Sequence, residues 1–402
     1  MAQEFGTVVI GAGIGGGHVV KELREQGYDK PIALVGSESL PPYHRPDLSK
    51  KVLVEGADTT ELGLEEEGWY AEHDITTYFG TDATGIDAAA HTVELGSGET
   101  LRYEKLVLAT GSVPHALDLP GAALDNVITL RDADDAEAIR ARFAEGANVV
   151  IIGGGWIGLE VAAAAKVNGC TVTVLLRSTP PLRAALGEEI GQYFADLHAR
   201  NGVVFRTDAT TTGFSGAGTV SGVETDNGSI PADLVVIGIG AAPATSLAEA
   251  AGLTVDDGVV VDEHLVTSDP DILAIGDIAD APNTLLGRRL RVEHWDNAVR
   301  QAAVAAATIR GHQRSYDWQP YFYTDQFDLG MEYVGTSAPD DDVVIRGEKS
   351  SGEFIVFWTR DDTVTAAMNV NIWDSSDELR ALVGKSVPAS RLQDTSIPVG
   401  EL

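Results

Sequence analysis

Two glycine-rich segments have the residue types and spacing that can hold a phosphate-containing ligand. They are GAGIGG at residues 11–16 and GGGWIG at residues 153–158. In a G-x-G-x-x-G loop the first glycine makes a tight turn, the second lets the backbone approach a pyrophosphate, and the third lets the next helix pack closely on the strand. The N-terminus of that helix offers positive charge to the phosphates. The glycines in these places are Gly11, Gly13 and Gly16 in the first loop and Gly153, Gly155 and Gly158 in the second.

Both loops lie between an apolar run and a helical pattern, which is the context that such a loop needs. The first loop follows the apolar run 5–10 and precedes a helix-like segment that ends at Gly27. A second apolar run, 31–36, comes next, and Glu38 after it has the type and place of an acid that binds a ribose. The same order of strand, loop, helix and strand returns over 148–176. The duplication therefore predicts two bound dinucleotides.

The rest of the chain contains further strand-like runs, and its residue pattern changes after residue 315. The runs 103–114 and 271–280 place small residues at the end of a strand, where open α/β sheets bind ligands. Beyond residue 315, aromatic and alternating segments are typical of antiparallel strands. We therefore predict an α/β fold with two Rossmann-like dinucleotide-binding domains and an α+β C-terminal domain. The predicted bounds are 1–111 and 241–314 for the first domain, 112–240 for the second and 315–402 for the third.

Composition excludes several classes of function. The chain has 28 Lys+Arg against 61 Asp+Glu among 402 residues, a formal charge of −33, which disfavours binding to nucleic acid phosphates. Salt adaptation and simple solubility are both consistent with this acidity. Cys170 is the only cysteine, so an internal disulfide and a cysteine-rich metal site are excluded. With no run of 18 or more apolar residues either, we expect a soluble cytoplasmic protein without a targeting segment, a membrane span or a metal site.

Seven motifs in order give the chain a family resemblance that covers essentially its whole length. It resembles the FAD-dependent NAD(P)H:ferredoxin reductases of the putidaredoxin reductase type, within the glutathione-reductase-like superfamily, which serve bacterial oxygenases. The motifs are GAGIGG (11–16), PPYHRPDLSK (41–50), LATGS (108–112), GGGWIGLE (153–160), IGDIAD (275–280), RVEHWDNAVRQA (291–302) and PYFYTDQFDLGMEYVG (320–335).

The resemblance implies that the first loop holds FAD and the second holds NADH or NADPH. It assigns Glu38 to the adenosine ribose and Asp277 to the ribityl chain, and places the backbone around Glu293, His294 and Trp295 beside the flavin pyrimidine. A simple core position is the alternative for Trp295. The FAD-binding residues implied by the matching motifs are Gly11, Gly13, Gly16, Glu38, Arg45, Lys50, Thr110, Gly111, Asp277, Glu293, His294 and Trp295.

Lys50 and Glu160 are the candidate catalytic residues. In the resembled family the matching lysine and glutamate form an ion pair beside the flavin N5 edge, where the nicotinamide arrives. They orient the rings and balance charge, and are not expected to shuttle protons. Taken alone, Glu160 could be an exposed acid favoured by the helix dipole, and Lys50 could lie on a solvated face.

The implied reaction passes electrons from NAD(P)H through FAD to a ferredoxin-type iron–sulfur protein that feeds a monooxygenase or dioxygenase. A nicotinamide gives up a hydride whereas an iron–sulfur centre accepts one electron, and flavin can do both. A redox cysteine pair is absent, and we expect Cys170 to be buried and structural, so electrons must leave to an external acceptor. A basic cluster near the predicted flavin helix could dock an acidic partner, or could be a solvated loop. Its residues are Arg288, Arg289 and Arg291 before the predicted helix and Arg310, His312 and Arg314 after it.

The sequence departs from the family pattern at three places. Family members that use NADH end the second strand of the nucleotide domain with an acid, but Leu176 stands there, followed by Arg177 and, a little further on, Arg183. Weaker discrimination in favour of NADH is therefore predicted, and the two arginines are assigned to the NAD(P)H site. Arg177 could contact the 2′-phosphate of NADPH or stack on adenine at the surface. Tyr323 replaces a frequent tryptophan, and Asp47 replaces a proline.

Two other functions stay open at this level. One is a reductase of a small acceptor such as a quinone or the ascorbyl radical. The other is an apoptosis-inducing-factor-like protein whose reduced state controls association. The sequence does not distinguish a monomer from a homodimer.

Overall fold

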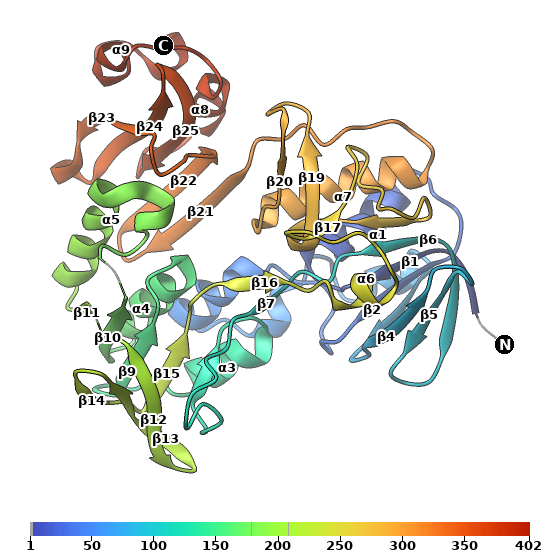
Figure 1. Cartoon of the computed structure of the whole chain (residues 1–402), viewed down its shortest axis with the longest axis horizontal. Coiled ribbons are helices and arrows are strands. Elements are labelled where there is room, and N and C mark those ends of the chain that lie inside the picture. The colour runs from blue at the N-terminus through green and yellow to red at the C-terminus, as the bar shows by residue number, and fades with distance from the viewer. Residues whose placement is uncertain (1–2, 178, 208) are drawn as a thin grey trace. The chain divides into compact units, whose positions relative to one another are not determined.

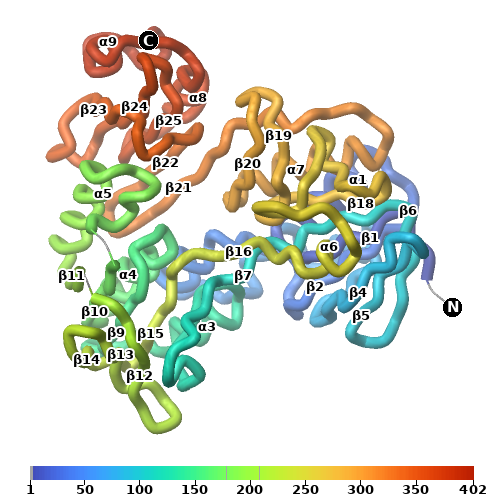
Figure 2. The backbone as a smooth tube through the Cα atoms, viewed as in Figure 1, coloured from blue at the N-terminus to red at the C-terminus, as the bar shows by residue number. Residues whose placement is uncertain are grey.

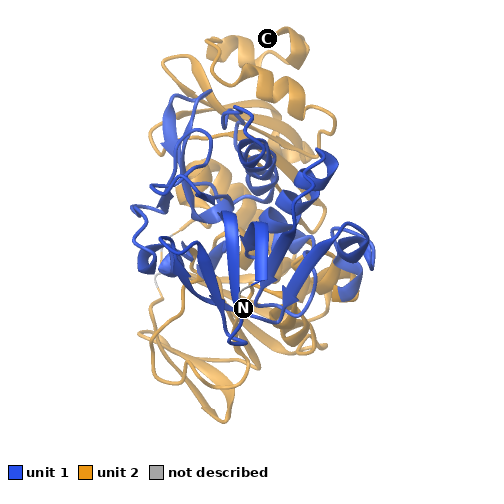
Figure 3. Cartoon of the chain, turned by 90° about the vertical axis from the view of Figure 1, so that its right-hand side faces the viewer, with its two compact units in different colours: residues 1–46, 60–113, 242–320 blue, residues 47–59, 114–241, 321–402 orange. Residues whose placement is uncertain are grey.

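Each of the two units of the structure is built from three separate stretches of chain. The computed structural model describes residues 3–177, 179–207 and 209–402. The first unit consists of Met1–Pro46, Thr60–Val113 and Ala242–Pro320, and the second of Asp47–Thr59, Pro114–Ala241 and Tyr321–Leu402 (Figure 3). Segments that are distant in sequence therefore meet inside each unit.

A mostly parallel sheet forms the centre of the first unit (Figure 1). Its strands lie in the order β3-β2-β1-β6, all parallel, and β6 pairs along its other edge with antiparallel β5 and parallel β18. The strands are β1 Gln3–Ile10, β2 Ile32–Gly36, β3 Ile75–Phe79, β4 Ala83–Asp87, β5 Thr92–Leu95, β6 Thr100–Leu108 and β18 Ile272–Ala274. Residues 5–10 of β1 and all of β2 are buried, as the continuous apolar runs of a parallel sheet require.

Two long helices cover this sheet and pack on each other, α1 (Ile14–Glu25) and α7 (Trp295–Ile309). The path from β1 through α1 to β2 can be followed in Figure 2 and confirms the predicted first strand, loop and helix. Short elements complete the unit, namely α2 Trp69–Glu72, α6 Ser246–Ala250, β17 Val259–Val260, β19 Ala279–Asn283 and β20 Arg288–Leu290. Two three-residue strands, β7 Ser112–Pro114 and β16 Ala241–Pro243, pair with each other where the chain leaves this unit and where it returns.

The second unit contains a five-stranded parallel sheet in the order β11-β10-β9-β15-β8. Strand β9 leads into α4, as the second predicted loop requires, and β10 follows. A three-stranded antiparallel sheet, β12-β13-β14, was not predicted from the sequence. The elements are β8 Val127–Thr129, α3 Ala133–Arg140, β9 Asn148–Ile152, α4 Trp156–Val167, β10 Thr171–Leu176, α5 Arg183–Arg200, β11 Val204–Thr207, β12 Thr211–Ala217, β13 Thr219–Thr225, β14 Gly228–Pro231 and β15 Leu234–Ile237.

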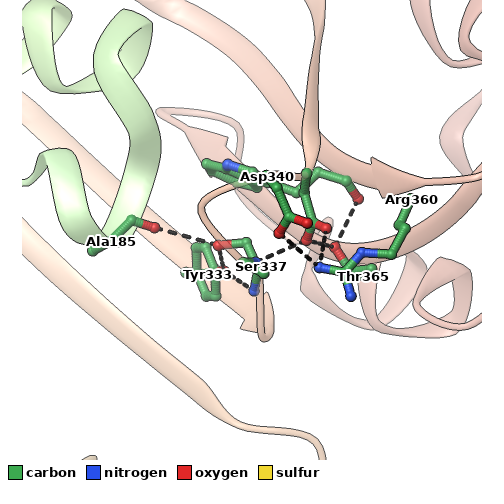
Figure 4. A network of polar contacts seen from close by, with 9 residues as sticks. Ala185, Tyr333, Ser337, Asp340, Arg360 and Thr365 are labelled. Carbon is green, nitrogen blue, oxygen red and sulfur yellow. Dashed lines mark hydrogen bonds and ion pairs between the residues drawn. The ribbon is translucent and has the colours of Figure 1, made fainter.

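The C-terminal part of the second unit is an antiparallel sheet in the order β21-β22-β25-β24-β23, followed by two short helices. Polar contacts join its turns: Arg360 pairs with Asp340 and Asp341, and Thr365 donates to Asp341 Oδ2 at 2.7 Å (Figure 4). The elements are β21 Tyr321–Gln326, β22 Leu329–Gly335, β23 Asp342–Glu348, β24 Glu353–Arg360, β25 Thr363–Val370, α8 Ser376–Leu382 and α9 Ala389–Gln393. In the ranges that the structure describes, every helix is too short or too polar to cross a bilayer.

Helix α5 carries a histidine that is entirely removed from solvent. His198 is 0% exposed and its ring meets Phe205 and Phe327 edge to face. Its Nε2 lies 2.8 Å from Gln326 Oε1. Burial lowers the pKa of His198 to about 4, because the imidazolium would lose its hydration and the bond to Gln326 compensates only in part. The ring is therefore neutral at physiological pH.

Replacing His198 with phenylalanine should reduce the acid sensitivity of the fold. The unfolded histidine takes up a proton that the folded one refuses, so stability falls as pH drops from about 6.5 toward about 4. Urea denaturation should show that the wild type loses about 2 kcal/mol more than His198→Phe between about pH 7 and about pH 5. Equal losses in the two proteins would mean that His198 titrates normally.

Candidate functional site

In the first glycine loop, a Cβ atom would fit at Gly13 but would collide with backbone atoms at Gly11 and Gly16. A Cβ atom at Gly11, where φ is +108°, would lie 2.1 Å from Ala109 O, and one at Gly16 would lie 1.9 Å from Gly11 O. At Gly13 the nearest atom to such a Cβ is Arg45 Nη2, at 3.9 Å. Gly13 is also the N-cap of α1 and provides no side-chain cap. The cradle therefore has room for a phosphate group at the positive end of α1, as a dinucleotide requires.

Glu38 follows β2 at the same edge of the sheet, with both oxygens engaged. Its Oε1 accepts from Arg45 Nη2 at 2.6 Å and its Oε2 accepts from the Tyr43 hydroxyl at 2.6 Å. Two donors thus fix the orientation of the carboxyl group, and its oxygens retain lone pairs that can accept from a ribose diol. The residues present fit the adenosine half of FAD.

The strand ends on the other side of β1 carry the remaining predicted contacts. Asp277 Oδ2 accepts from the Ser112 hydroxyl at 2.7 Å, in the 3-10 helix Gly276–Ile278 that follows β18. Thr110 donates its hydroxyl to Ala244 O at 2.8 Å. Gly111 adopts φ +70° and its carbonyl accepts from the Ala244 N–H. Thr110 and Gly111 therefore tie two chain segments together at this edge.

The N-terminus of α7 contains the three residues predicted to face the flavin pyrimidine. His294 is the N-cap without a side-chain cap, and Trp295 begins the helix half-buried. Burial lowers the pKa of His294 to about 4 although Asp277 opposes the shift, so the ring is neutral. Glu293 is exposed and pairs with Arg291 at 2.5 Å.

The second glycine loop repeats the clearances of the first. A Cβ at Gly153, where φ is +112°, would lie 2.2 Å from Gly238 O, and one at Gly158 would lie 2.6 Å from Gly153 O. At Gly155 the nearest atom is Gly238 O at 4.0 Å, and Gly155 is the uncapped N-cap of α4. The two loops thus present the same opening at the start of a helix.

Glu160 lies inside α4 and is surrounded by donors from two other segments. Its Oε2 accepts from Lys50 Nζ at 2.9 Å and from the Ser49 hydroxyl, and its Oε1 accepts from Thr324 Oγ1 at 2.5 Å. The Lys50 and Glu160 side chains are 14% and 5% exposed. Lys50 therefore does not lie on a solvated face, and Glu160 is not an exposed acid at a helix end. Removing one partner from a pair this buried costs about 3–5 kcal/mol because the other charge is left uncompensated.

Tyr323 lies beside the pair, with Lys50 Nζ 5.2 Å from its ring centroid. Burial, together with the neighbouring carboxylates, raises the pKa of Tyr323 to about 12. Burial likewise raises the pKa of the Asp325 carboxyl, and the Lys50 charge opposes that rise. Sequence reasoning named Lys50 and Glu160 but missed Ser49 and Thr324, although both lie in motifs that it quoted, because only the folded chain shows where their hydroxyls point.

The predicted nucleotide-selecting residues lie at the end of β10 and just beyond it. Leu176 is buried and Arg177 beside it is exposed. Arg183 donates to Thr179 O at 3.3 Å and lies 3.5 Å from Glu188. Arg177 is thus presented to solvent at the carboxyl end of a parallel strand.

Cys170 and the basic cluster differ in how far solvent reaches them. Cys170 is 1% exposed, and burial raises the pKa of its thiol, which fits the structural role predicted for it.

The arginines of the predicted basic cluster make contacts of their own. Arg289 pairs with Asp280 at 2.9 Å, and Arg291 pairs with Asp257 and Glu293. Arg310 donates to Gln26 at 3.2 Å, whereas Arg288 is exposed on β20. These partners tie Arg289 and Arg291 into the first unit.

Residues 5–302 match the family described as pyridine nucleotide-disulphide oxidoreductase, and residues 321–402 match the family described as reductase C-terminal. The chain belongs to the pyridine nucleotide-disulphide oxidoreductase family. It is 38% identical to the ferredoxin–NAD(+) reductase component of an anthranilate 1,2-dioxygenase system from Burkholderia cepacia, over 94% of this chain and 93% of that one. It is 36% identical to putidaredoxin reductase of Pseudomonas putida, over 98% and 96%.

A solved structure extends this family likeness to the fold. The covalent complex of putidaredoxin reductase with putidaredoxin contains a chain that matches with a TM-score of 0.93 at 35% identity, over 100% of this chain and 98% of that one. The predicted fold class, two Rossmann-like domains with an α+β C-terminal domain, is confirmed.

Alanine substitutions at four loop glycines should lower the free energy of unfolding only where a Cβ atom has no room. Gly16→Ala and Gly158→Ala place a methyl group against backbone oxygen and should lower the free energy of unfolding by about 1–3 kcal/mol. Gly13→Ala and Gly155→Ala, where the backbone is extended and the space open, should change it by less than about 0.5 kcal/mol. Urea denaturation of the nucleotide-free proteins measures both. Equal losses at all four positions would contradict the clearances.

Proposed function

We propose that this protein passes electrons from NADH or NADPH through FAD to a ferredoxin-type iron–sulfur protein that feeds a monooxygenase or dioxygenase. The observation that carries the proposal is the pair of glycine loops with similar clearances, each between a strand of its own sheet and the helix that follows. Two such cradles suit two dinucleotides. The names of the relatives, reductase components of a dioxygenase system and of putidaredoxin, support the class of partner.

The two cradles take different nucleotides in this proposal. The first loop, with Glu38 beyond β2 and Asp277 beyond β18, holds FAD, which when bound accepts a hydride and releases single electrons. The second loop, Gly153 to Gly158, holds the nicotinamide nucleotide. The domain division predicted above carries over, with a flavin domain at 1–111 and 241–314, a nicotinamide domain at 112–240 and a C-terminal domain at 315–402.

Lys50 and Glu160 act at the hydride-transfer step by charge and position. Glu160 begins the second turn of the nucleotide helix and holds Lys50 at 2.9 Å in a largely dry environment. At an effective dielectric near 20 that contact is worth about 6 kcal/mol of Coulomb energy before desolvation is subtracted. The pair can therefore keep an ammonium ion in place without a water shell. The uncapped N-terminus of α7, with neutral His294, offers positive charge to the flavin ring.

The nucleotide preference follows from the end of β10. A carboxylate is missing at Leu176, so an adenosine ribose has no charge-assisted acceptor there, and exposed Arg177 can reach a 2′-phosphate. We therefore infer that NADPH is accepted at least as readily as NADH. The cytoplasmic location stays a prediction that rests on the single cysteine.

Anaerobic bleaching of the flavin absorbance tests the proposal directly. Mixing the FAD-loaded protein with NADPH, and separately with NADH, should bleach it rapidly with at least one of them, and adding a ferredoxin should then restore the colour. Gly155→Ala should keep its FAD but bleach roughly ten- to hundredfold more slowly at low nucleotide concentration, because the pyrophosphate loses backbone contacts. A yellow protein that neither nucleotide bleaches would overturn the proposal, and reoxidation by quinone but not by ferredoxin would favour a small acceptor.

The ferredoxin would dock on the basic residues around strand β20 and the end of α7. We assign contact with an acidic ferredoxin to Arg288, which is exposed on β20, with Arg310 as a second contact.

Charge reversal at Arg288 tests its predicted contact with the ferredoxin. Arg288→Glu should slow ferredoxin reduction several-fold at low salt and leave flavin bleaching unchanged, since a rim charge acts mainly on association. Arg289→Glu should lower the free energy of unfolding, because Asp280 loses its partner. Stopped-flow reduction at low and high ionic strength measures the first effect, and identical rates for wild type and Arg288→Glu would exclude this surface.

A further inference from the structure

A buried chain of hydrogen bonds runs from Glu160 to the histidine of α5. Thr324 Oγ1 lies 2.5 Å from Glu160 Oε1, Gln326 Nε2 lies 3.0 Å from Thr324 Oγ1, and His198 Nε2 lies 2.8 Å from Gln326 Oε1. Thr324 and Gln326 are each 1% exposed. The four side chains come from α4, β21 and α5, all in the second unit.

The hydrogen-bonding capacity of each group gives this chain a direction. Glu160 accepts from Lys50 and Ser49 through one oxygen, and as a carboxylate it accepts the Thr324 proton through the other. The single Thr324 proton is then used, so its oxygen accepts from the Gln326 amide nitrogen. The amide oxygen faces His198, which must carry its proton on Nε2.

The far end of the chain fits this assignment. Nδ1 of His198 is buried without a hydrogen-bond partner among the described residues, against the rings of Phe205 and Phe327. A neutral ring with its one proton on Nε2 leaves Nδ1 as the atom that needs no acceptor. All the protons of the chain therefore point toward Glu160.

Reversing the chain would take the donor away from Glu160. If the Gln326 amide turned over, its oxygen would draw the Thr324 proton, and Glu160 Oε1 would lose its hydrogen bond or have to be protonated. His198 prevents this because its Nε2–H needs the amide oxygen. A residue without contact to Lys50 can in this way govern the state of the carboxylate that holds Lys50.

Resting on the function proposed above, we propose that His198, Gln326 and Thr324 are positioning residues that keep the Glu160 carboxylate oriented for Lys50, and thereby set the rate of hydride transfer. The ion pair alone leaves the carboxylate free to rotate about its bond to the side chain. Thr324 fixes the second oxygen, Gln326 fixes the hydroxyl of Thr324, and His198 fixes the amide of Gln326.

The test measures the limiting rate of flavin bleaching in FAD-loaded variants with the more effective nucleotide. Thr324→Val should lower that rate roughly ten- to hundredfold with little change in the nucleotide concentration that gives half the rate, and Thr324→Ser should restore it to within about twofold. Gln326→Glu, whose carboxylate accepts from both neighbours, should be slowed similarly. His198→Phe should be slowed roughly three- to tenfold, since the amide is freed but not removed.

Thr365→Val is the matched control. Thr365 also donates to a carboxylate, Asp341, at 2.7 Å in the same C-terminal sheet, remote in sequence from Glu160 (Figure 4). This variant should bleach like the wild type. Equal slowing in Thr365→Val and Thr324→Val would show a general effect of weakening the sheet and overturn the proposal, as would wild-type rates in Thr324→Val.

A second measurement does not depend on turnover. Nitrogen-15 NMR of labelled histidine, with the His198 signal assigned from its loss in His198→Phe, should show a neutral ring protonated on Nε2. A proton on Nδ1 would reverse the chain and overturn the proposal. If Thr324→Val fails to fold, Gln326→Glu and the NMR result decide. A wild type that does not bleach at all would instead contradict the proposed function, whatever the variants do.

Discussion

A carboxylate buried in α4 must be surrounded by donors, and this need explains how the second unit is put together. Glu160 comes from the stretch 114–241, Ser49 and Lys50 come from 47–59, and Thr324 comes from 321–402. The three stretches that form the unit therefore each contribute to one hydrogen-bonded cluster. Without its donors the carboxylate would be an uncompensated buried charge, so the ion pair and the joining of the three stretches depend on each other.

In both glycine loops the last glycine lacks room for a side chain, because it packs against a backbone oxygen of the same loop. Gly16 is pressed against Gly11 O, and Gly158 is pressed against Gly153 O, because the helix that follows each loop starts almost on top of the strand before it. Only the middle glycine of each loop faces open space. This division of roles lets a helix N-terminus approach a ligand closely while the outer glycines hold the backbone, which is why the spacing carries more information than the glycine content.

Much of the fold could be predicted from the sequence, because strands of parallel sheets and the glycine loops have strong local patterns. The strands around both loops, the Ala-rich helix α7, the antiparallel C-terminal strands and the burial of Cys170 all follow from such patterns. Long-range pairing could not be predicted. The stretch 47–59 groups with the second unit, Arg289 and Arg291 pair with their own unit's acids, and Gln326 meets His198 across 128 positions. Such partners depend on how elements pack and leave no mark in residue spacing.

Charge is the constraint that links this architecture to a macromolecular partner. With a formal charge of −33, the protein repels acidic partners at long range, so attraction must come from a local cluster of cations. Arg289 pairs with Asp280, and Arg291 with both Asp257 and Glu293, which cancels their field at a distance. Arg288, on the same hairpin, is exposed, so its charge can approach a partner closely. Docking on this surface is therefore governed by the charges within about one Debye length of the contact, while the acidic remainder disfavours binding elsewhere.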